Sequence, residues 1–353
     1  MSRINMDGPE GNAPPRPAAA TTSKAMKYTS LITLVLQTTS IILFLRVSRT
    51  SVGMKYLSST AVTMTEVLKV VICLAVMLAQ NGGSVRAVTH TIDTEILQKR
   101  GETLKLLIPA VLYTIQNNLL FLALSHLDAA TYQVTYQLKI LTTAVFSVTM
   151  LSKRIAAHQW IALVILTVGV ALVQMPTGIE ATTKKNSEGS TLIGLTAVIL
   201  ACFSSGFSGV YFEKILKSSK TSLWVRNLQL GFFSVLIALG GVVVTDLNAV
   251  LENGFFQGYN WLTVTVIFFH GFGGIIVALT IRYADNILKC FAGAVSIILS
   301  CVISYLFLGD FVPSLIFVLG TTMVIIATFL YGYEKPAVSP LLAKSRSDNV
   351  LTS

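Results

Sequence analysis

Long runs of apolar residues, separated by short polar segments, recur along the whole chain. Their length matches the roughly 20 residues that an α-helix needs to cross the hydrocarbon core of a bilayer. The pattern therefore predicts an all-α membrane protein with ten transmembrane helices. Their expected ranges are 29–47, 57–79, 103–124, 129–151, 159–176, 190–212, 222–244, 261–281, 288–308 and 311–333.

The two ends of the chain do not share this pattern. Residues 1–26 are polar and rich in Pro, Ala and Thr, and they lack the apolar core of a cleavable signal peptide. Residues 334–353 are also polar. We therefore expect a disordered cytosolic tail at 1–26, a ten-helix domain at 27–333, and a second disordered cytosolic tail at 334–353.

Composition supports a membrane protein, and charge supplies its orientation. Hydrophobic residues make up 53% of the chain and charged residues only 12%, against about 25% charged in soluble domains. The net charge of +10 would suggest a nucleic-acid partner in a soluble protein. Here, with ten spans and both termini in the cytosol, 19 Lys and Arg fall on the cytosolic side and 5 on the other. This bias follows the positive-inside rule and removes the need for nucleic acid.

The ten spans divide into two halves of five, at 27–177 and 190–333. The pattern Leu138-Lys139-x4-Ala144-Val145 in the first half recurs as Leu288-Lys289-x4-Ala294-Val295 in the second. Because each half has an odd number of spans, the second half must enter the membrane inverted. Inverted repeats are typical of secondary transporters, which bind substrate near the midplane between the halves.

Lys139 falls inside the span predicted at 129–151. A lysine there costs roughly 3 kcal/mol, so it usually lines a water-filled cavity and pairs with another group. Tyr132, Tyr136 and Lys139 stand at i, i+4 and i+7 and so share one helix face. Lys139 has no carboxylate three or four residues away. Its counter-charge must come from another helix or from a ligand, which indicates a site for an anion that also carries a ring.

Other polar and small positions at membrane depth have two interpretations each. Tyr113, Gln116 and Asn117 form an i, i+3, i+4 cluster that either lines a site or hydrogen-bonds neighbouring helices. Gly206 and Gly209 give one helix a small face, which more often serves close helix packing than ligand contact.

The remaining intramembrane charges have neighbours of opposite sign. Glu66 and Lys69 are i, i+3, and mutual neutralisation is the simpler interpretation, with a gating role as the alternative. Asp285 and Lys289 are i, i+4 at the edge of a span, so a structural ion pair competes with a ligand role for Lys289.

No catalytic or metal-binding pattern accompanies these residues. The four cysteines and four histidines are scattered, and the chain has no D-x-D, no H-x-x-x-H and no nucleophile elbow. We therefore expect neither an enzyme nor a cofactor.

Several longer segments resemble the nucleotide-sugar transporters of the Golgi, and the resemblance extends from Lys27 to Tyr333. The segments that carry it are Gln116-Asn117-Asn118, residues 127–140 (Leu-Asp-Ala-Ala-Thr-Tyr-Gln-Val-Thr-Tyr-Gln-Leu-Lys-Ile), residues 205–214 (Ser-Gly-Phe-Ser-Gly-Val-Tyr-Phe-Glu-Lys), residues 224–229 (Trp-Val-Arg-Asn-Leu-Gln) and residues 283–289 (Tyr-Ala-Asp-Asn-Ile-Leu-Lys). Residues 56–61, 254–260 and 310–313 most resemble transporters of UDP-N-acetylglucosamine, with UDP-galactose transporters next.

This resemblance implies a fold of the drug/metabolite transporter type and alternating access. It implies that a cytosolic nucleotide sugar, UDP-N-acetylglucosamine or UDP-galactose, is exchanged for lumenal UMP. The implied location is the Golgi membrane, with the endoplasmic reticulum as the alternative. A homo-oligomer or a complex with glycosyltransferases is also compatible with it.

The resemblance also assigns substrate-binding roles. Tyr113 and Asn117 match positions near the base and ribose, and Asn227 matches a further polar contact. Residues 132, 136 and 139 match the central site, where the lysine meets phosphate. Gly206 and Gly209 match glycines that let the nucleotide approach the helix backbone, and Lys289 matches a second lysine of the cavity. The implied set is Tyr113, Asn117, Tyr132, Tyr136, Lys139, Gly206, Gly209, Asn227 and Lys289.

The chain departs from the family pattern at a few positions. Cys290 stands where glycine usually follows the lysine, Arg282 replaces a lysine, and Ser208 replaces an alanine. Gly231 occupies a place where CMP-sialic acid transporters tend to have tyrosine, which favours a uracil nucleotide. The alternatives are a CMP-sialic acid/CMP exchanger, another metabolite exporter of the same fold, and a membrane-embedded glycosyltransferase.

Overall fold

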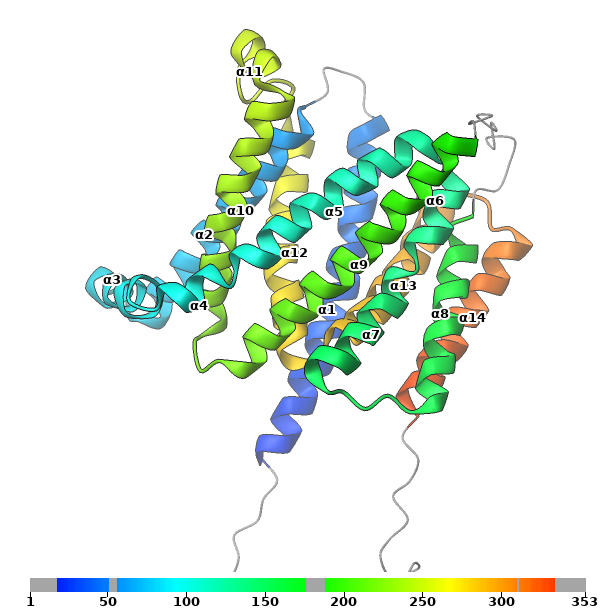
Figure 1. The fold of residues 1–353 in the computed structure, drawn as a ribbon, viewed down its shortest axis with the longest axis horizontal. Helices are drawn as coiled ribbons and strands as arrows, with labels where there is room; N and C mark the ends of the chain where they lie inside the picture. Colours follow the sequence, from blue (N-terminus) through cyan, green and yellow to red (C-terminus); the bar gives the residue numbers. More distant parts are fainter. Residues whose placement is uncertain (1–17, 51–55, 176–187, 310, 334–353) are drawn as a thin grey trace, which may run out of the picture.

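The structure is a computed structural model that describes residues 18–50, 56–175, 188–309 and 311–333. The tail predicted at 334–353 and the first 17 residues of the tail predicted at 1–26 lie outside the described residues. Helices form a single bundle (Figure 1). In chain order they are α1 (Ala18–Thr50), α2 (Ser58–Gln80), α3 (Val85–Ile92), η1 (Asp93–Leu97), α4 (Arg100–Leu104), α5 (Leu107–His126), α6 (Ala129–Tyr136), α7 (Lys139–Leu151), α8 (Ala157–Val173), α9 (Glu188–Ser218), α10 (Leu223–Thr245), α11 (Leu247–Asn253), α12 (Trp261–Tyr283), α13 (Asn286–Ile303), η2 (Ser304–Leu308) and α14 (Leu315–Gly332).

Nine helical segments of the described chain are long and apolar enough to cross a membrane. Each coincides with one of the ten predicted spans. The remaining prediction, at 159–176, falls on α8, an apolar helix of 17 residues that is shorter than the other nine. The protein is therefore a multi-pass, all-helical membrane protein, with nine candidate spans, by length and composition, in the part of the chain that the structure describes.

The first helix begins earlier than the sequence predicted. Residues 18–26 were assigned to the disordered tail, yet α1 already includes them. Three alanines, Ala18 to Ala20, open this helix. Alanine has the highest helix propensity, so the apolar span that follows can extend back through them. The start of α1 and the end of α14 lie on the same side of the bundle (Figure 1).

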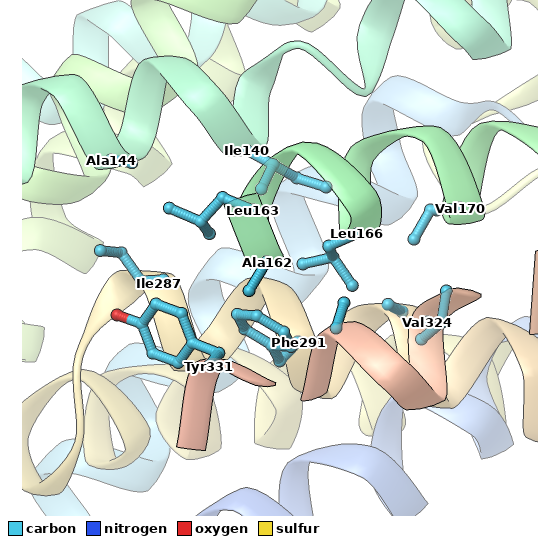
Figure 2. Close-up of a cluster of buried hydrophobic side chains, with 12 residues drawn as sticks. Ile140, Ala144, Ala162, Leu163, Leu166, Val170, Ile287, Phe291, Val324 and Tyr331 are labelled. Carbon is cyan, nitrogen blue, oxygen red and sulfur yellow. The ribbon is translucent and has the colours of Figure 1, made fainter. Parts of the chain in front are cut away.

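The tightest helix pair is α8 with α14. A side chain on Gly320 would meet the Gly169 carbonyl oxygen at 2.7 Å, so the two backbones are nearly in contact. Around them lies a cluster of buried apolar side chains from α7, α8, α13 and α14, which includes Leu163, Leu166 and Phe291 (Figure 2). Close backbone approach at small residues is how helices pack when lipid removes the hydrophobic driving force. This packing fixes α8 against the element that carries Lys289.

The span predicted as one helix at 129–151 is broken between α6 and α7. At the break the Leu138 amide donates to the Thr135 carbonyl at 3.1 Å, an i→i−3 bond in place of the α-helical pattern. The Gln137 side chain, buried in the break, donates to Gln174 Oε1 at the end of α8 at 3.1 Å. No proline or glycine marks the position, which is why the sequence predicted a continuous helix.

Candidate functional site

A cavity of about 220 Å³ lies at the helix break, between the start of α7 and the first half of α13. Polar and apolar side chains of five helical elements or their junctions contribute to its wall. The lining residues are Tyr136, Gln137, Lys139, Ile140, Thr143, Val170, Ser205, Lys289, Cys290, Gly293, Ala294 and Ile297. Three of the nine site residues predicted from the sequence are among them: Tyr136, Lys139 and Lys289.

The stripe of two tyrosines and a lysine keeps a common face across the break. The Tyr132 and Tyr136 rings are stacked, with centroids 6.0 Å apart and planes 18° apart. Lys139 Nζ lies 3.9 Å from the centroid of the Tyr136 ring, within the range of a cation–π interaction. The tyrosine face thus holds the ammonium group at the cavity wall while leaving its N–H groups available to donate.

Two lysines share this cavity without a carboxylate. Among the residues that the structure describes, neither Lys139 nor Lys289 forms an ion pair. Lys139 is the first residue of α7, and Lys289 lies in the first turn of α13. Helix N-termini carry partial positive charge, which adds to that of the ammonium groups. The cavity therefore suits a ligand that carries negative charge.

The sequence analysis considered Asp285 as the structural partner of Lys289, and in the structure Asp285 has other partners. Its carboxylate forms an ion pair with Lys153. Its Oδ1 accepts a hydrogen bond from the Leu288 amide at 2.8 Å and so caps α13. Because the Asp285 carboxylate is paired with Lys153 and with the Leu288 amide, it does not form the ion pair with Lys289 that the i, i+4 spacing suggested.

The polar cluster on α5 reaches the site through a residue that was not selected from the sequence. Gln116 is buried, and its Nε2 donates to the Tyr136 hydroxyl at 3.1 Å. Asn117, the predicted contact, has an exposed side chain, and Tyr113 is half-buried. The i, i+3 relation to Tyr113 was the signal for Gln116, and the bond to Tyr136 matches the second interpretation, a hydrogen bond to a neighbouring helix.

The cap of α6 holds the helix that presents Tyr132 and Tyr136. Asp128 precedes α6, and its Oδ1 accepts a hydrogen bond from the Thr131 amide at 2.9 Å. Hydrogen bonds from the Thr131 side chain and amide stabilise the carboxylate and lower the pKa of Asp128 below its ordinary value. An ionised cap stabilises the first turn of α6.

The two predicted glycines lie in helix contacts of α9. A Cβ added at Gly206 would lie 2.8 Å from Thr142 Oγ1 and 2.9 Å from the Thr142 carbonyl carbon of α7. Gly209 faces Asn286 of α13, whose Nδ2 donates to the Gly209 carbonyl at 2.5 Å. Both glycines are buried. Close packing, the alternative interpretation from the sequence, thus accounts for their size in this conformation.

Asn227 lies on α10, away from the cavity wall. It is buried, and its Nδ2 donates to the Leu223 carbonyl of its own helix at 2.9 Å. Thr143, Ser205 and Cys290 line the cavity although the sequence did not single them out as contacts. They are small residues on otherwise apolar helices, so only the three-dimensional arrangement distinguishes them.

We expect Gly206→Ala to lower the thermal unfolding midpoint of the ligand-free protein. The added methyl group meets backbone atoms of α7, which must move, and overpacking of this kind costs about 1–3 kcal/mol. The measurement is thermal unfolding in detergent without nucleotide. Gly240→Ala on α10, where a Cβ meets nothing within 4 Å, is the matched control. A Gly206→Ala protein that unfolds at the wild-type temperature but no longer binds UMP would assign Gly206 to the ligand instead.

Comparison with known proteins adds an independent result. A family model of nucleotide-sugar transporters matches residues 22–332. The chain is 56% identical over 321 residues to the human UDP-N-acetylglucosamine transporter, covering 90% of this chain and 99% of that protein. It is 51% identical over 322 residues to a Caenorhabditis elegans UDP-N-acetylglucosamine/UDP-N-acetylgalactosamine transporter, covering 89% and 95%.

A more distant relative and a solved structure complete the comparison. The chain is 44% identical over 324 residues to the mouse UDP-galactose translocator, covering 92% of this chain and 83% of that protein. One crystal structure superposes with a TM-score of 0.63 at 12% sequence identity, covering 88% of this chain and 96% of that chain. At this identity the superposition supports the helical fold alone.

Proposed function

Because the chain belongs to the nucleotide-sugar transporter family, we propose that it exchanges UDP-sugars for UMP across the Golgi membrane. Its cargo would be UDP-N-acetylglucosamine, UDP-galactose or both, moved from the cytosol into the lumen by alternating access. Members of this family are transporters and not enzymes, in agreement with the expectation from the sequence.

The observation that carries the proposal is the pair of lysines in one cavity. Neither Lys139 nor Lys289 forms an ion pair with a described carboxylate, and a nucleoside diphosphate sugar brings two negative charges. The Tyr136 ring beside Lys139 supplies an aromatic surface at the same wall. Lysine is a point donor, whereas arginine would grip phosphate with two parallel hydrogen bonds, so lysine favours release. Binding with release is what a carrier requires.

The proposed site extends beyond the present cavity. Tyr113, Asn117, Tyr132 and Asn227 are proposed to approach the base, ribose or sugar in another state of the transport cycle. A volume of about 220 Å³ is smaller than the roughly 300–1,000 Å³ of ordinary ligand sites, so opening must enlarge it. Gly206 and Gly209 are proposed to contribute where α9 separates from α7 and α13 in that state.

Two inverted repeats of five spans, 27–177 and 190–333, are part of the proposal. They require α8 to cross the membrane as the tenth span. Its central position in a buried cluster with α7, α13 and α14 supports this. The start of α1 and the end of α14 lie on the same side of the bundle, which agrees with an even number of crossings. The excess of Lys and Arg in the segments assigned to that side supports the proposal that both termini lie in the cytosol.

Homo-oligomers and complexes with glycosyltransferases remain further proposals for partners. The lumenal product of exchange is the donor that such enzymes use, which would favour their proximity. Co-purification from a Golgi membrane preparation tests both.

We expect UMP to compete with UDP-N-acetylglucosamine uptake far better than CMP does. The relatives described above carry names that specify UDP-sugars, and Gly231 stands where CMP-sialic acid transporters tend to have tyrosine. The measurement is uptake of labelled nucleotide sugars into proteoliposomes preloaded with UMP, in the presence of increasing UMP or CMP outside. Stronger competition by CMP would assign the protein to the CMP-sialic acid exchangers.

A further inference from the structure

A groove on the outside of the bundle is separate from the substrate cavity. It has a volume of about 620 Å³ and lies between α1, α13 and the end of α14. Its apolar wall includes Leu31, Val35, Phe291, Val295 and Tyr331. No lining residue is shared with the cavity, because the two spaces lie on different faces of α13.

The charges of this groove are confined to one end. Lys27, at the start of the groove on α1, forms no ion pair with any described residue. Lys153 and Asp285 lie at the same end and pair with each other. Two lysines and one carboxylate leave one net positive charge. Tyr28, adjacent to Lys27, is 61% exposed, as is common for aromatic residues at a membrane surface.

We propose that this groove binds an anionic phospholipid of the cytosolic leaflet. Its phosphate lies at Lys27 and Lys153, and one acyl chain runs along α1 over α13. The single net positive charge matches the single net negative charge of a phosphatidylserine headgroup. Basic pockets between transmembrane helices on the cytosolic side are suited to anionic headgroups.

The dimensions of the groove favour a lipid over a free phosphate ion. From Lys27 to Leu36 the groove follows nine residue steps of α1, or about 14 Å at about 1.5 Å per residue. Half of a hydrocarbon core of about 30 Å is about 15 Å, the length available to an acyl chain in one leaflet. Ile32 and Leu36 are 62% and 57% exposed, so the groove is open to the bilayer along this length. A small anion would occupy only the charged end of the groove and leave its apolar wall uncovered.

The test measures thermal unfolding of the full chain in detergent with increasing phosphatidylserine or phosphatidylcholine. We expect phosphatidylserine to stabilise the wild-type protein at concentrations where phosphatidylcholine does not. Lys27→Ala should raise the half-effective phosphatidylserine concentration roughly fivefold, since one lysine near an anionic headgroup contributes about that factor. Lys24→Ala is the matched control, because Lys24 is an exposed lysine of the same helix outside the groove.

A second pair of variants tests the acyl-chain groove. Val295→Phe should fill it and weaken the phosphatidylserine effect. Val302→Phe, at a similarly exposed position of α13 outside the groove, should not. Equal stabilisation by phosphatidylcholine, full stabilisation by glycerophosphate alone, or equal losses in Lys27→Ala and Lys24→Ala would each overturn the proposal. Stabilisation by UMP should be unchanged in all four variants, which separates this site from the transport site.

Discussion

Lys139→Ala is expected to weaken UMP binding by roughly 10- to 150-fold. One charge-assisted hydrogen bond to phosphate contributes about 1.5–3 kcal/mol, and this substitution removes it. The fold should suffer little, because Lys139 has no ion pair among the described residues and an intramembrane cation is itself a cost. The contact that is lost within the protein is the one with the Tyr136 ring, 3.9 Å from Nζ. The measurement is the UMP concentration needed for half-maximal thermal stabilisation, together with transport.

Two further variants make this prediction specific. Lys139→Arg should bind UMP but turn over more slowly, because a guanidinium holds phosphate with two parallel hydrogen bonds. Lys214→Ala, which removes an exposed lysine on α9 away from the cavity, should bind and transport as the wild type does. If Lys139→Ala responds to UMP as the wild type does, or if it fails to fold, Lys139 holds helices together and is not a ligand contact.

Lys139 could be found from the sequence, because a charged residue within an apolar run of span length is energetically unfavourable and therefore conspicuous. A charge in an apolar run of span length has few explanations, and Tyr132 and Tyr136 at helical spacing gave its surroundings. The apolar runs themselves located nine spans and the short α8. Periodicity and hydropathy are local properties, so these predictions needed no knowledge of which helices touch.

The side-chain pairs that form between different helices were harder to predict from the sequence. The i, i+4 spacing of Asp285 and Lys289 suggested an ion pair, but Lys153, from a loop more than a hundred residues earlier, takes the carboxylate. At the break before Lys139, the Gln137 side chain donates a hydrogen bond to Gln174 at the end of α8. These contacts are set by tertiary packing, and no local residue preference encodes them.

The roles of small residues were ambiguous for a related reason. A glycine permits the close approach of either a neighbouring helix or a ligand, and the sequence alone does not distinguish the two. At Gly206 the neighbour is the α7 backbone, and at Gly209 it is Asn286. Family resemblance suggested the ligand, whereas this conformation shows helix packing. Both statements hold if α9 separates from its neighbours when the carrier opens, which the transport cycle in the proposed function requires.

Uptake of UDP-N-acetylglucosamine is expected to be at least about tenfold faster into proteoliposomes loaded with UMP than into empty ones. In the proposed cycle, the empty carrier reorients with Lys139 and Lys289 facing no bound anion, whereas the loaded carrier reorients with phosphate beside both lysines. A lysine in the membrane costs roughly 2.5–3.5 kcal/mol. If even half of one such cost enters the barrier of the empty return step, that step slows by about tenfold or more.

The exchange experiment has two controls, the nucleotide loaded into the vesicles and the Lys139→Ala variant. Initial uptake is compared between vesicles loaded with UMP, loaded with AMP, and empty, at the same protein content. AMP-loaded vesicles should behave as empty ones if the base is recognised. In Lys139→Ala the empty carrier has one fewer uncompensated charge, so the ratio of loaded to empty rates should fall toward one even though both rates are low. Equal rates for loaded and empty wild-type vesicles would contradict coupling through the lysines, since the return of the carrier would then not depend on an anion in the cavity.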